Sequence, residues 1–425
     1  MAPPWRRRTT MYSCRKARKS FDEALVGVTD MAAVLQARKL PPAPTVAIDP
    51  WIAISAIALA SLGVVMVASS SIAVGEELHV GPFYFLTRHA LFLALGTALG
   101  ALVYRTDLEW LKRYSQIMIL GAFVLLVMVF VPGLGVTVKG ARRWIWLGVS
   151  NFQAVEAVKL FLIIYLAGYF VRHQETLQHS LMGVIKPLVV AGALIGLLLV
   201  QPDFGGALLL MALAGNMVWL AGGSARHLLG IAAVAVPVMV FAAMAEPYRL
   251  RRLFSFMDPW ADPFDGGFQL TQALIAVGRG EWFGVGLGES VQKLFYLPEA
   301  HTDFILAVIA EELGFVGVLT IIGLFATFTG RAFRLGIEGL RQGRAFEAYL
   351  AYGIALWFSM QAAISIGVNI GALPTKGLTL PLISSGGSSV IMSCVAVGLL
   401  LKVSASLREP RSVGPFEGVG TGGKR

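Results

Sequence analysis

Hydrophobic and polar positions divide the chain into a polar N-terminal segment and a series of long apolar runs that starts at Trp51. The runs have the length of helices that cross a bilayer, about 17–25 residues, and lack the alternating segments of about 10 residues that build outer-membrane barrels. The pattern predicts an all-α, polytopic membrane protein with about ten transmembrane helices and one long external loop between helices 7 and 8. The predicted spans are 51–70, 88–104, 114–131, 154–171, 184–200, 205–221, 227–245, 304–330, 347–368 and 386–404.

Composition agrees with this fold class. Hydrophobic residues make up 56% of the chain and charged residues 14%, and the mean hydropathy is +0.71. These are too few charges to cover a soluble globule. The two cysteines, Cys14 and Cys394, fall in segments that are not expected to meet, so we expect neither a disulfide framework nor a thiolate metal site.

The distribution of positive charge predicts the orientation in the membrane. The net charge is +10, and Lys and Arg gather in the N-terminal segment and the short loops on its side, as topology determinants do. An even number of spans returns both termini to that side. We therefore expect both termini in the cytoplasm, and we expect no nucleic-acid partner.

Three regions follow from this pattern. Residues 1–47 are predicted to form a disordered basic cytoplasmic tail, because they lack the apolar core of a signal peptide. Residues 48–406 form the transmembrane domain, with an external loop at 246–303. Residues 407–425 form a cytoplasmic C-terminal tail.

Several cations lie in the predicted external loops, against the topological bias. Clustered arginines bind phosphate groups well, so these cations favour a polyanionic ligand such as a pyrophosphate on the external face. The alternative is that translocated loops simply tolerate some positive charge. The cations are Lys139, Arg142, Arg143, Arg249, Arg251, Arg252, Arg279, Lys293 and Lys376.

The external loop at 246–303 is rich in aromatic residues and glycine, and loops of this length are functional or disordered. Its aromatic content favours function, with Trp260 and Trp282 at the membrane interface. The stretch GRGEWFGVGLG at 278–288 has the glycines of a phosphate-binding loop, but it follows no predicted strand. We therefore predict no nucleotide site there.

Asp303 lies where this loop enters the eighth apolar run. A carboxylate is costly at a membrane boundary, so its presence indicates either a cap on the helix or a functional site. His301 and Glu299 lie beside it and make a polar cluster that favours a site.

Glu311 is not a catalytic twin of Asp303. Eight residues of helix separate the two by about 12 Å, whereas paired carboxylates in glycosidases lie about 5–9.5 Å apart. Glu311 and Glu312 are instead predicted to face the bundle interior, where they hold neighbouring helices or water.

Other polar residues fall inside or between the apolar runs. Glu156 and Lys159 are three residues apart, which predicts an ion pair on one helix face. Asp203 lies in the short turn QPDFGG and has either a turn role or a site role. The Gly/Pro/Ser-rich segment 371–389 is predicted to line a groove, since non-helical backbone at a membrane must be shielded.

At these same residues the chain resembles the SEDS family (shape, elongation, division and sporulation) over about residues 50–405, and within it the cell-division branch. This chain departs from the family at two places. It has Ala154 and Val155 where the family usually has Pro-Ser or Pro-Ala, and it has Ser385 where the family usually has Tyr. The resemblance rests on GARRWIWLG, QAVEAVKL, QPDFGG, PYRLRR, GGFQLTQALIAVGRGEWFGVGLG, SVQKLFYLPEAHTDFILAVIAEELG and ALPTKGLTLPLISSGGSS.

The resemblance implies an inverting peptidoglycan glycosyltransferase that polymerises lipid II at the outer face of the cytoplasmic (inner) membrane during septal wall synthesis. It implies that Asp303 is the catalytic base. The predicted substrate-binding residues are Arg142, Arg143, Arg249, Lys376, His301 and Asp203.

The resemblance also implies partners. These are lipid II, the growing glycan strand, a class B penicillin-binding transpeptidase and other membrane proteins of the division complex, with enrichment at the septum. A divalent cation (Mg²⁺ or Mn²⁺) is expected at the pyrophosphate, with no organic cofactor and with its protein ligands unknown.

Two other functions fit the same pattern. A lipid II flippase also has many helices, buried charges and a broken segment, whereas a non-catalytic recruiter of the septal transpeptidase needs no catalytic acid. Polar residues on one external face, rather than at the bilayer midplane, favour the polymerase.

Overall fold

The computed structural model describes residues 48–409 except 139, 149, 246, 264–266 and 376, together with all their side chains but those of 247–249, 251 and 253. The predicted tail at 1–47, with Cys14, and residues 410–425 of the predicted C-terminal tail lie outside the described residues.

Each of the ten predicted apolar runs falls on a helix. Within the described residues, eight helices are long and apolar enough to cross a membrane. Two more, α5 (Ser115–Met128) and α9 (Phe204–Leu220), are apolar but shorter, with 14 and 17 residues. The eight are α2 (Pro50–Glu77), α3 (Tyr84–Tyr104), α6 (Ala154–Arg172), α8 (Leu181–Val200), α10 (Ala225–Met244), α13 (Ile305–Arg341), α14 (Ala345–Asn369) and α15 (Gly387–Arg408).

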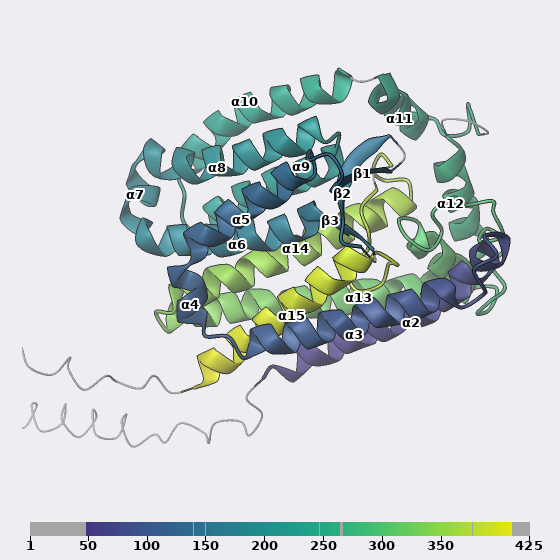
Figure 1. Cartoon of the computed structure of the whole chain (residues 1–425), viewed down its shortest axis with the longest axis horizontal. Helices are drawn as coiled ribbons and strands as arrows, with labels where there is room; N and C mark the ends of the chain where they lie inside the picture. Colours follow the sequence, from purple (N-terminus) through teal and green to yellow (C-terminus); the bar gives the residue numbers. More distant parts are fainter. Residues whose placement is uncertain are drawn as a thin grey trace, which may run out of the picture. The chain divides into compact units, whose positions relative to one another are not determined.

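Four shorter helices lie in three of the connections between these helices. The helices α4 (Leu108–Arg113) and α7 (Gln174–His179) lie at one end of the helical bundle (Figure 1). The helices α11 (Pro247–Met257) and α12 (Phe268–Arg279) lie at the other end and occupy the region predicted as one external loop. The hydropathy pattern did not reveal these two helices, because both are shorter than the membrane-length runs that identified the others.

A three-stranded antiparallel sheet joins α5 to α6, and the all-α prediction missed it. Its strands are β1 (Gly135–Val138), β2 (Ala141–Trp146) and β3 (Asn151–Gln153), in the order β1-β2-β3. Trp144 pairs with Val136 on one side and with Gln153 on the other. Strands of three to six residues are too short for a hydrophobic alternation to be recognised.

Burial differs strongly among the apolar helices. In α6, 89% of the most apolar window is buried inside the protein, whereas in α10 the share is 6%. A helix that is apolar all round lies at the centre of a bundle or faces lipid, and these two helices represent the two cases. In Figure 1, α6 runs through the bundle and α10 along its edge.

Small residues bring α3 and α15 into close contact. A Cβ at Gly100 would lie 2.6 Å from Cys394 O, and one at Gly398 would lie 2.3 Å from Gly100 O. Gly96 and Gly100 are spaced as in membrane helix pairs that pack through glycine. The contact places the first turns of α15 beside the part of α3 that includes Phe92 and Gly96.

Candidate active site

Asp303 lies two residues before α13 begins at Ile305. Phe304 occupies the N-cap position of the helix and makes no side-chain cap. Asp303 is therefore not the N-cap residue of α13, the position at which capping alone would explain a carboxylate.

The carboxylate of Asp303 faces the segment that leads into α15. A Cβ built on Gly377 would lie 3.0 Å from Asp303 Oδ2, so the backbone of this segment passes directly beside the carboxylate. Asp303 is partly exposed and Gly377 is exposed. A side chain at position 377 would therefore crowd the carboxylate.

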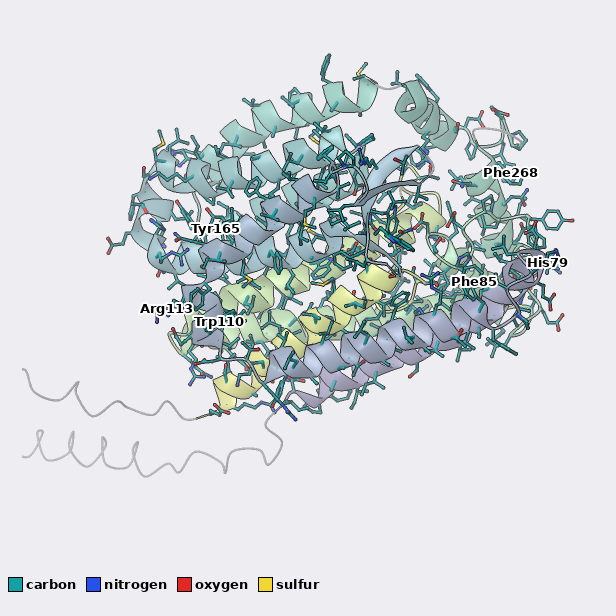
Figure 2. The ribbon with its side chains drawn as sticks, viewed as in Figure 1. His79, Phe85, Trp110, Arg113, Tyr165 and Phe268 are labelled. Carbon is teal, nitrogen blue, oxygen red and sulfur yellow. The ribbon has the colours of Figure 1, made fainter. Side chains whose placement is uncertain are left out.

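Two further contacts join the walls of this site. Ser385 N donates to His301 O at 3.0 Å, and the His301 ring lies 4.9 Å from the ring of Phe85 on α3. Figure 2 labels Phe85 near the end of the molecule that carries α12. His301 thus links α3, the Asp303 loop and the segment before α15.

The predicted ion pair on α6 is present and buried. Lys159 Nζ lies 2.8 Å from Glu156 Oε2, and the side chains are 1% and 5% exposed. Lys159 also donates to Gln361 Oε1 at 2.8 Å, and Gln361 Nε2 donates to Thr379 O at 2.8 Å. This network supports the backbone two residues beyond Gly377, from inside the bundle.

Arg143 of strand β2 contacts Asp203, the residue before α9. Arg143 Nη1 lies 3.5 Å from Asp203 Oδ1, and Arg143 also donates to Pro202 O. Asp203 is buried and caps α9 by accepting from Gly206 N at 3.1 Å. Arg142 donates to Val131 O at 3.0 Å. Asp203 therefore has the turn role that the sequence left open.

Glu311 and Glu312 are buried, as predicted, but they hold a loop as well as a helix. Glu311 accepts from Arg279 Nη1 and Val291 N, each at 3.1 Å. Glu312 Oε1 accepts from Lys293 Nζ at 2.8 Å and from Ser69 Oγ of α2 at 2.6 Å.

Arg279 and Lys293 consequently differ from the sequence prediction, which placed them among cations facing a polyanion. Each forms an ion pair with a fully buried glutamate, at 3.1 and 2.8 Å. A buried carboxylate needs a nearby cation to offset its desolvation. Their partners lie 32 and 19 residues away, which no local pattern reveals.

Helix α13 is broken at Gly314, where φ is 67° and ψ is −166°. The loop at 281–286 fills the break. Val285 N and Gly286 N donate to Glu311 O and Glu312 O at 2.9 and 3.1 Å, and Phe315 N donates to Glu281 O at 2.9 Å. Backbone groups released by a break inside a membrane need such partners.

The glycines of the 278–288 stretch explain how the loop approaches so closely. A Cβ at Gly284 would lie 2.1 Å from Glu312 O, and one at Gly280 would lie 1.8 Å from Ala310 O. The loop that has the glycines of a phosphate-binding loop therefore packs against helix backbone.

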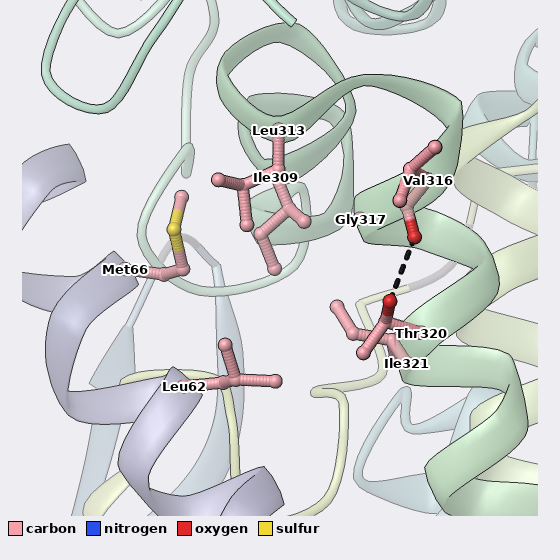
Figure 3. A pocket seen from close by; sticks show the side chains of 8 residues that line it. All are labelled: Leu62, Met66, Ile309, Leu313, Val316, Gly317, Thr320 and Ile321. Carbon is pink, nitrogen blue, oxygen red and sulfur yellow. Dashed lines mark hydrogen bonds between the residues drawn. The ribbon is translucent and has the colours of Figure 1, made fainter. Parts of the chain in front are cut away.

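An apolar cavity of about 180 Å³ lies beside this break, between α2 and α13 (Figure 3). Thr320 is its only hydroxyl-bearing side chain, and that hydroxyl donates to Val316 O at 2.8 Å. None of the predicted site residues lines it. The lining residues are Leu62, Met66, Ile309, Leu313, Val316, Gly317, Thr320 and Ile321.

The sequence model of the cell cycle protein family FtsW/RodA/SpoVE matches residues 50–409. The chain belongs to this family. A relative from Xanthomonas oryzae pv. oryzae named "Probable peptidoglycan glycosyltransferase FtsW" is 56% identical over 84% of this chain and 72% of its own length.

Solved structures agree with the family. One, from work titled "Structural coordination of polymerization and crosslinking by a peptidoglycan synthase complex", has a TM-score of 0.69 and 29% identity, and covers 85% of this chain and 98% of that chain. The rod shape determining protein RodA of Thermus thermophilus has a TM-score of 0.62 and 27% identity, over 85% and 97% of the two chains.

Two of the predicted substrate-binding cations in this family member fall outside what the structure describes. Lys376 lies outside the described residues, although its neighbour Gly377 lies beside Asp303. The side chain of Arg249 on α11 is not described. Their roles stay predictions.

Departures of this chain from the usual family residues leave the site's backbone intact. Helix α6 begins at Ala154 without the usual proline. Ser385, where the family usually has Tyr, contributes its backbone N–H to His301 O.

The predicted divalent cation has no protein-only site among the described residues, since no three His, Cys, Asp or Glu side chains of that part of the chain come together. We therefore assign no reaction step to a metal ion.

Sequence reasoning missed Asn369, Gln361 and Ser69. All three are polar residues inside apolar runs. Asn369 and Gln361 are buried, and Ser69 is partly buried. Polar residues within membrane helices point to contacts in the bundle interior, which is the signal that would have found them.

Proposed function

We propose that this chain is a peptidoglycan glycosyltransferase that polymerises lipid II. The observation that carries the proposal is the position of Asp303. Its carboxylate is partly exposed at the start of a membrane helix, beside the exposed backbone of Gly377, and it is not the helix cap. The named relative supports the reaction class.

In the proposed reaction Asp303 acts as general base. Its carboxylate takes the proton from the 4-hydroxyl of the acceptor sugar, and that oxygen forms a bond to the anomeric carbon of the donor. The bond from the anomeric carbon to the pyrophosphate oxygen breaks, and undecaprenyl pyrophosphate leaves with the electron pair. Attack opposite the leaving group inverts the anomeric centre. A positioned base contributes about 10²–10⁴-fold to such a step.

The leaving pyrophosphate requires positive charge nearby. Arg142 and Arg143 are partly exposed on β2, where their guanidinium groups also contact Val131 O and Pro202 O. With Arg249 and Lys376 they remain our candidates for binding it. His301 joins them as a substrate contact, through its position on the wall of the site.

A flippase is the second candidate, and one observation favours it. Transporters contain discontinuous helices, and α13 is broken at Gly314. Here, however, a docked loop satisfies the backbone groups of the break. The break therefore forms a closed packing contact, in contrast to the wet ion site of a transporter.

The wider cellular assignment follows from the same proposal. We infer that both termini face the cytoplasm, that the site faces outward, and that the enzyme acts at the division septum. A neighbouring solved structure is described as coordinating polymerisation with crosslinking. This supports a class B penicillin-binding transpeptidase as the partner.

Purified protein with lipid II in detergent tests the reaction, because no membrane is present to be crossed. We expect glycan strands from the wild type together with its transpeptidase. Absence of product under these conditions, with lipid II transport in proteoliposomes, would favour the flippase. Normal division by cells that carry only Asp303→Ala would favour a non-catalytic recruiter.

A further inference from the structure

Asn369 is the last residue of α14 and is fully buried. Its carboxamide reaches across to the start of α13. We infer that Asn369 is a positioning residue, which holds the backbone that carries Asp303. The inference rests on the proposed role of Asp303 as the base.

The carboxamide uses both of its ends. Its Oδ1 accepts from Ala307 N at 3.0 Å. Its Nδ2 donates to Asp303 O at 3.1 Å and to Ser365 O at 2.8 Å. The bond to Ser365, four residues earlier on α14, fixes the side chain against its own helix. The bonds to Ala307 N and Asp303 O hold the Asp303 loop against this fixed side chain.

The contact with Ala307 adds a side-chain acceptor at the first turn of α13, where Ala307 N also donates to Phe304 O at 3.0 Å. The first turn of a helix leaves N–H groups without helical partners, and the N-cap residue Phe304 has no side-chain acceptor. Asn369 brings an acceptor from α14 to this turn.

The same side chain connects both walls of the site. The chain leaves α14 at Asn369 and reaches Gly377, where an added Cβ would lie 3.0 Å from Asp303 Oδ2. Asn369 thus ties the loop that carries the base to the helix from which the opposite wall emerges. In enzymes, a shift of about 1 Å in a reacting group costs about a hundredfold in rate.

The first test compares Asn369→Ala with a matched control, Asn216→Ala. Asn216 is a half-buried asparagine of α9 with one local bond, from Nδ2 to Ala212 O at 2.8 Å. We expect Asn369→Ala to lower kcat for lipid II polymerisation by about tenfold to a hundredfold, with KM unchanged within about threefold, and Asn216→Ala to leave both constants unchanged. Equal effects of the two variants would overturn the inference.

A double variant separates positioning from general support of the fold. If Asn369 acts through Asp303, Asn369→Ala lowers the residual rate of Asp303→Asn no further, since residues that act as one unit are not additive. A further loss of the same size in the Asp303→Asn background would show that Asn369 acts independently, and would overturn the inference.

Asn369→Asp is the second variant, for the case in which Asn369→Ala does not fold. It keeps the shape and the acceptor for Ala307 N, and replaces the Nδ2 donor by oxygen. We expect it to lower kcat in the same way. A wild-type rate in this variant would contradict a role for the bond to Asp303 O.

Hydrogen exchange tests the positioning without reference to activity. We expect amides of residues 299–307 to exchange at least about tenfold faster in Asn369→Ala than in the wild type, because the loop and the first turn lose their anchor. Should the wild type not polymerise lipid II, the proposed function fails and this measurement still decides the inference. Unchanged exchange would overturn it.

Discussion

The two halves of α13 are anchored in different ways. Beyond the break, Arg331 pairs with Asp49, which is 0% exposed. Asp49 also accepts from Trp51 N at 3.0 Å as the cap of α2. This carboxylate serves the fold through a cap and an ion pair.

The half of α13 before the break is anchored by other parts of the chain, and the carboxylate near its start is that of Asp303. Asn369 contacts the first turn, and the loop at 281–286 fills the other end of the half-helix. Asp303 lies beside exposed Gly377 and is not the cap. The comparison teaches that the start of a helix can be anchored by groups other than the carboxylate that lies beside it.

The largest loss of stability is expected from Glu312→Gln. The change leaves the ammonium of Lys293, 10% exposed, without its carboxylate partner. Breaking a buried ion pair costs about 3–5 kcal/mol. Thermal unfolding in one detergent measures the loss, with exposed Glu338→Gln on the same helix as the control. If adding Lys293→Met does not recover part of it, the ion pair is not its cause.

Gly314→Ala should have the next largest effect, because it removes the junction between the two halves. A Cβ there would lie 2.3 Å from Gly284 N, and φ is 67°. Strain and overpacking together cost about 2–4 kcal/mol. We expect a lower unfolding temperature and faster proteolysis of the 281–286 loop. Wild-type behaviour in both measurements would show that the loop does not depend on this glycine.

Asp49→Asn sharpens the contrast between the two carboxylates. Loss of charge beside the partly exposed Arg331 and a weaker cap should cost about 1–3 kcal/mol. The rate of lipid II polymerisation per folded molecule should stay within about twofold. Asp107→Asn, an exposed cap of α4, is the control for stability. A large loss of turnover in Asp49→Asn would remove the distinction between the halves.

The smallest effect is expected from Gly323→Ala in the second half of α13. A Cβ at this position meets nothing within 4 Å, and alanine favours a helix over glycine by up to about 1 kcal/mol. The unfolding temperature should stay the same or rise slightly. If Gly323→Ala lowers the unfolding temperature as much as Gly314→Ala does, the loss of stability in Gly314→Ala cannot be attributed to the helix break.

Local patterns in the sequence predicted much of this molecule. Run length and hydropathy gave the ten apolar helices, because a bilayer fixes the length of a span. The spacing of Glu156 and Lys159 gave their ion pair, since both lie on one helix face. The boundary between polar loop and apolar run pointed to Asp303, whose role as the base stays a prediction.

The remaining features depend on contacts between distant segments. Asn369 lies 66 residues from Asp303, and Arg279 lies 32 residues from Glu311. No periodicity connects such pairs. The sheet at 135–153 consists of strands too short to carry a pattern. The glycines at 280–288 have the spacing of a phosphate loop, and only the broken helix beside them explains their use.

The most direct test of the central claim is the initial rate of lipid II polymerisation by purified Asp303→Asn, measured beside the wild type at equal concentrations of folded protein and with the transpeptidase partner present. This variant keeps the size of the side chain and removes the base. We predict a fall of about a hundredfold to ten-thousandfold. A rate within about tenfold of the wild type would contradict the assignment of Asp303 as the catalytic base.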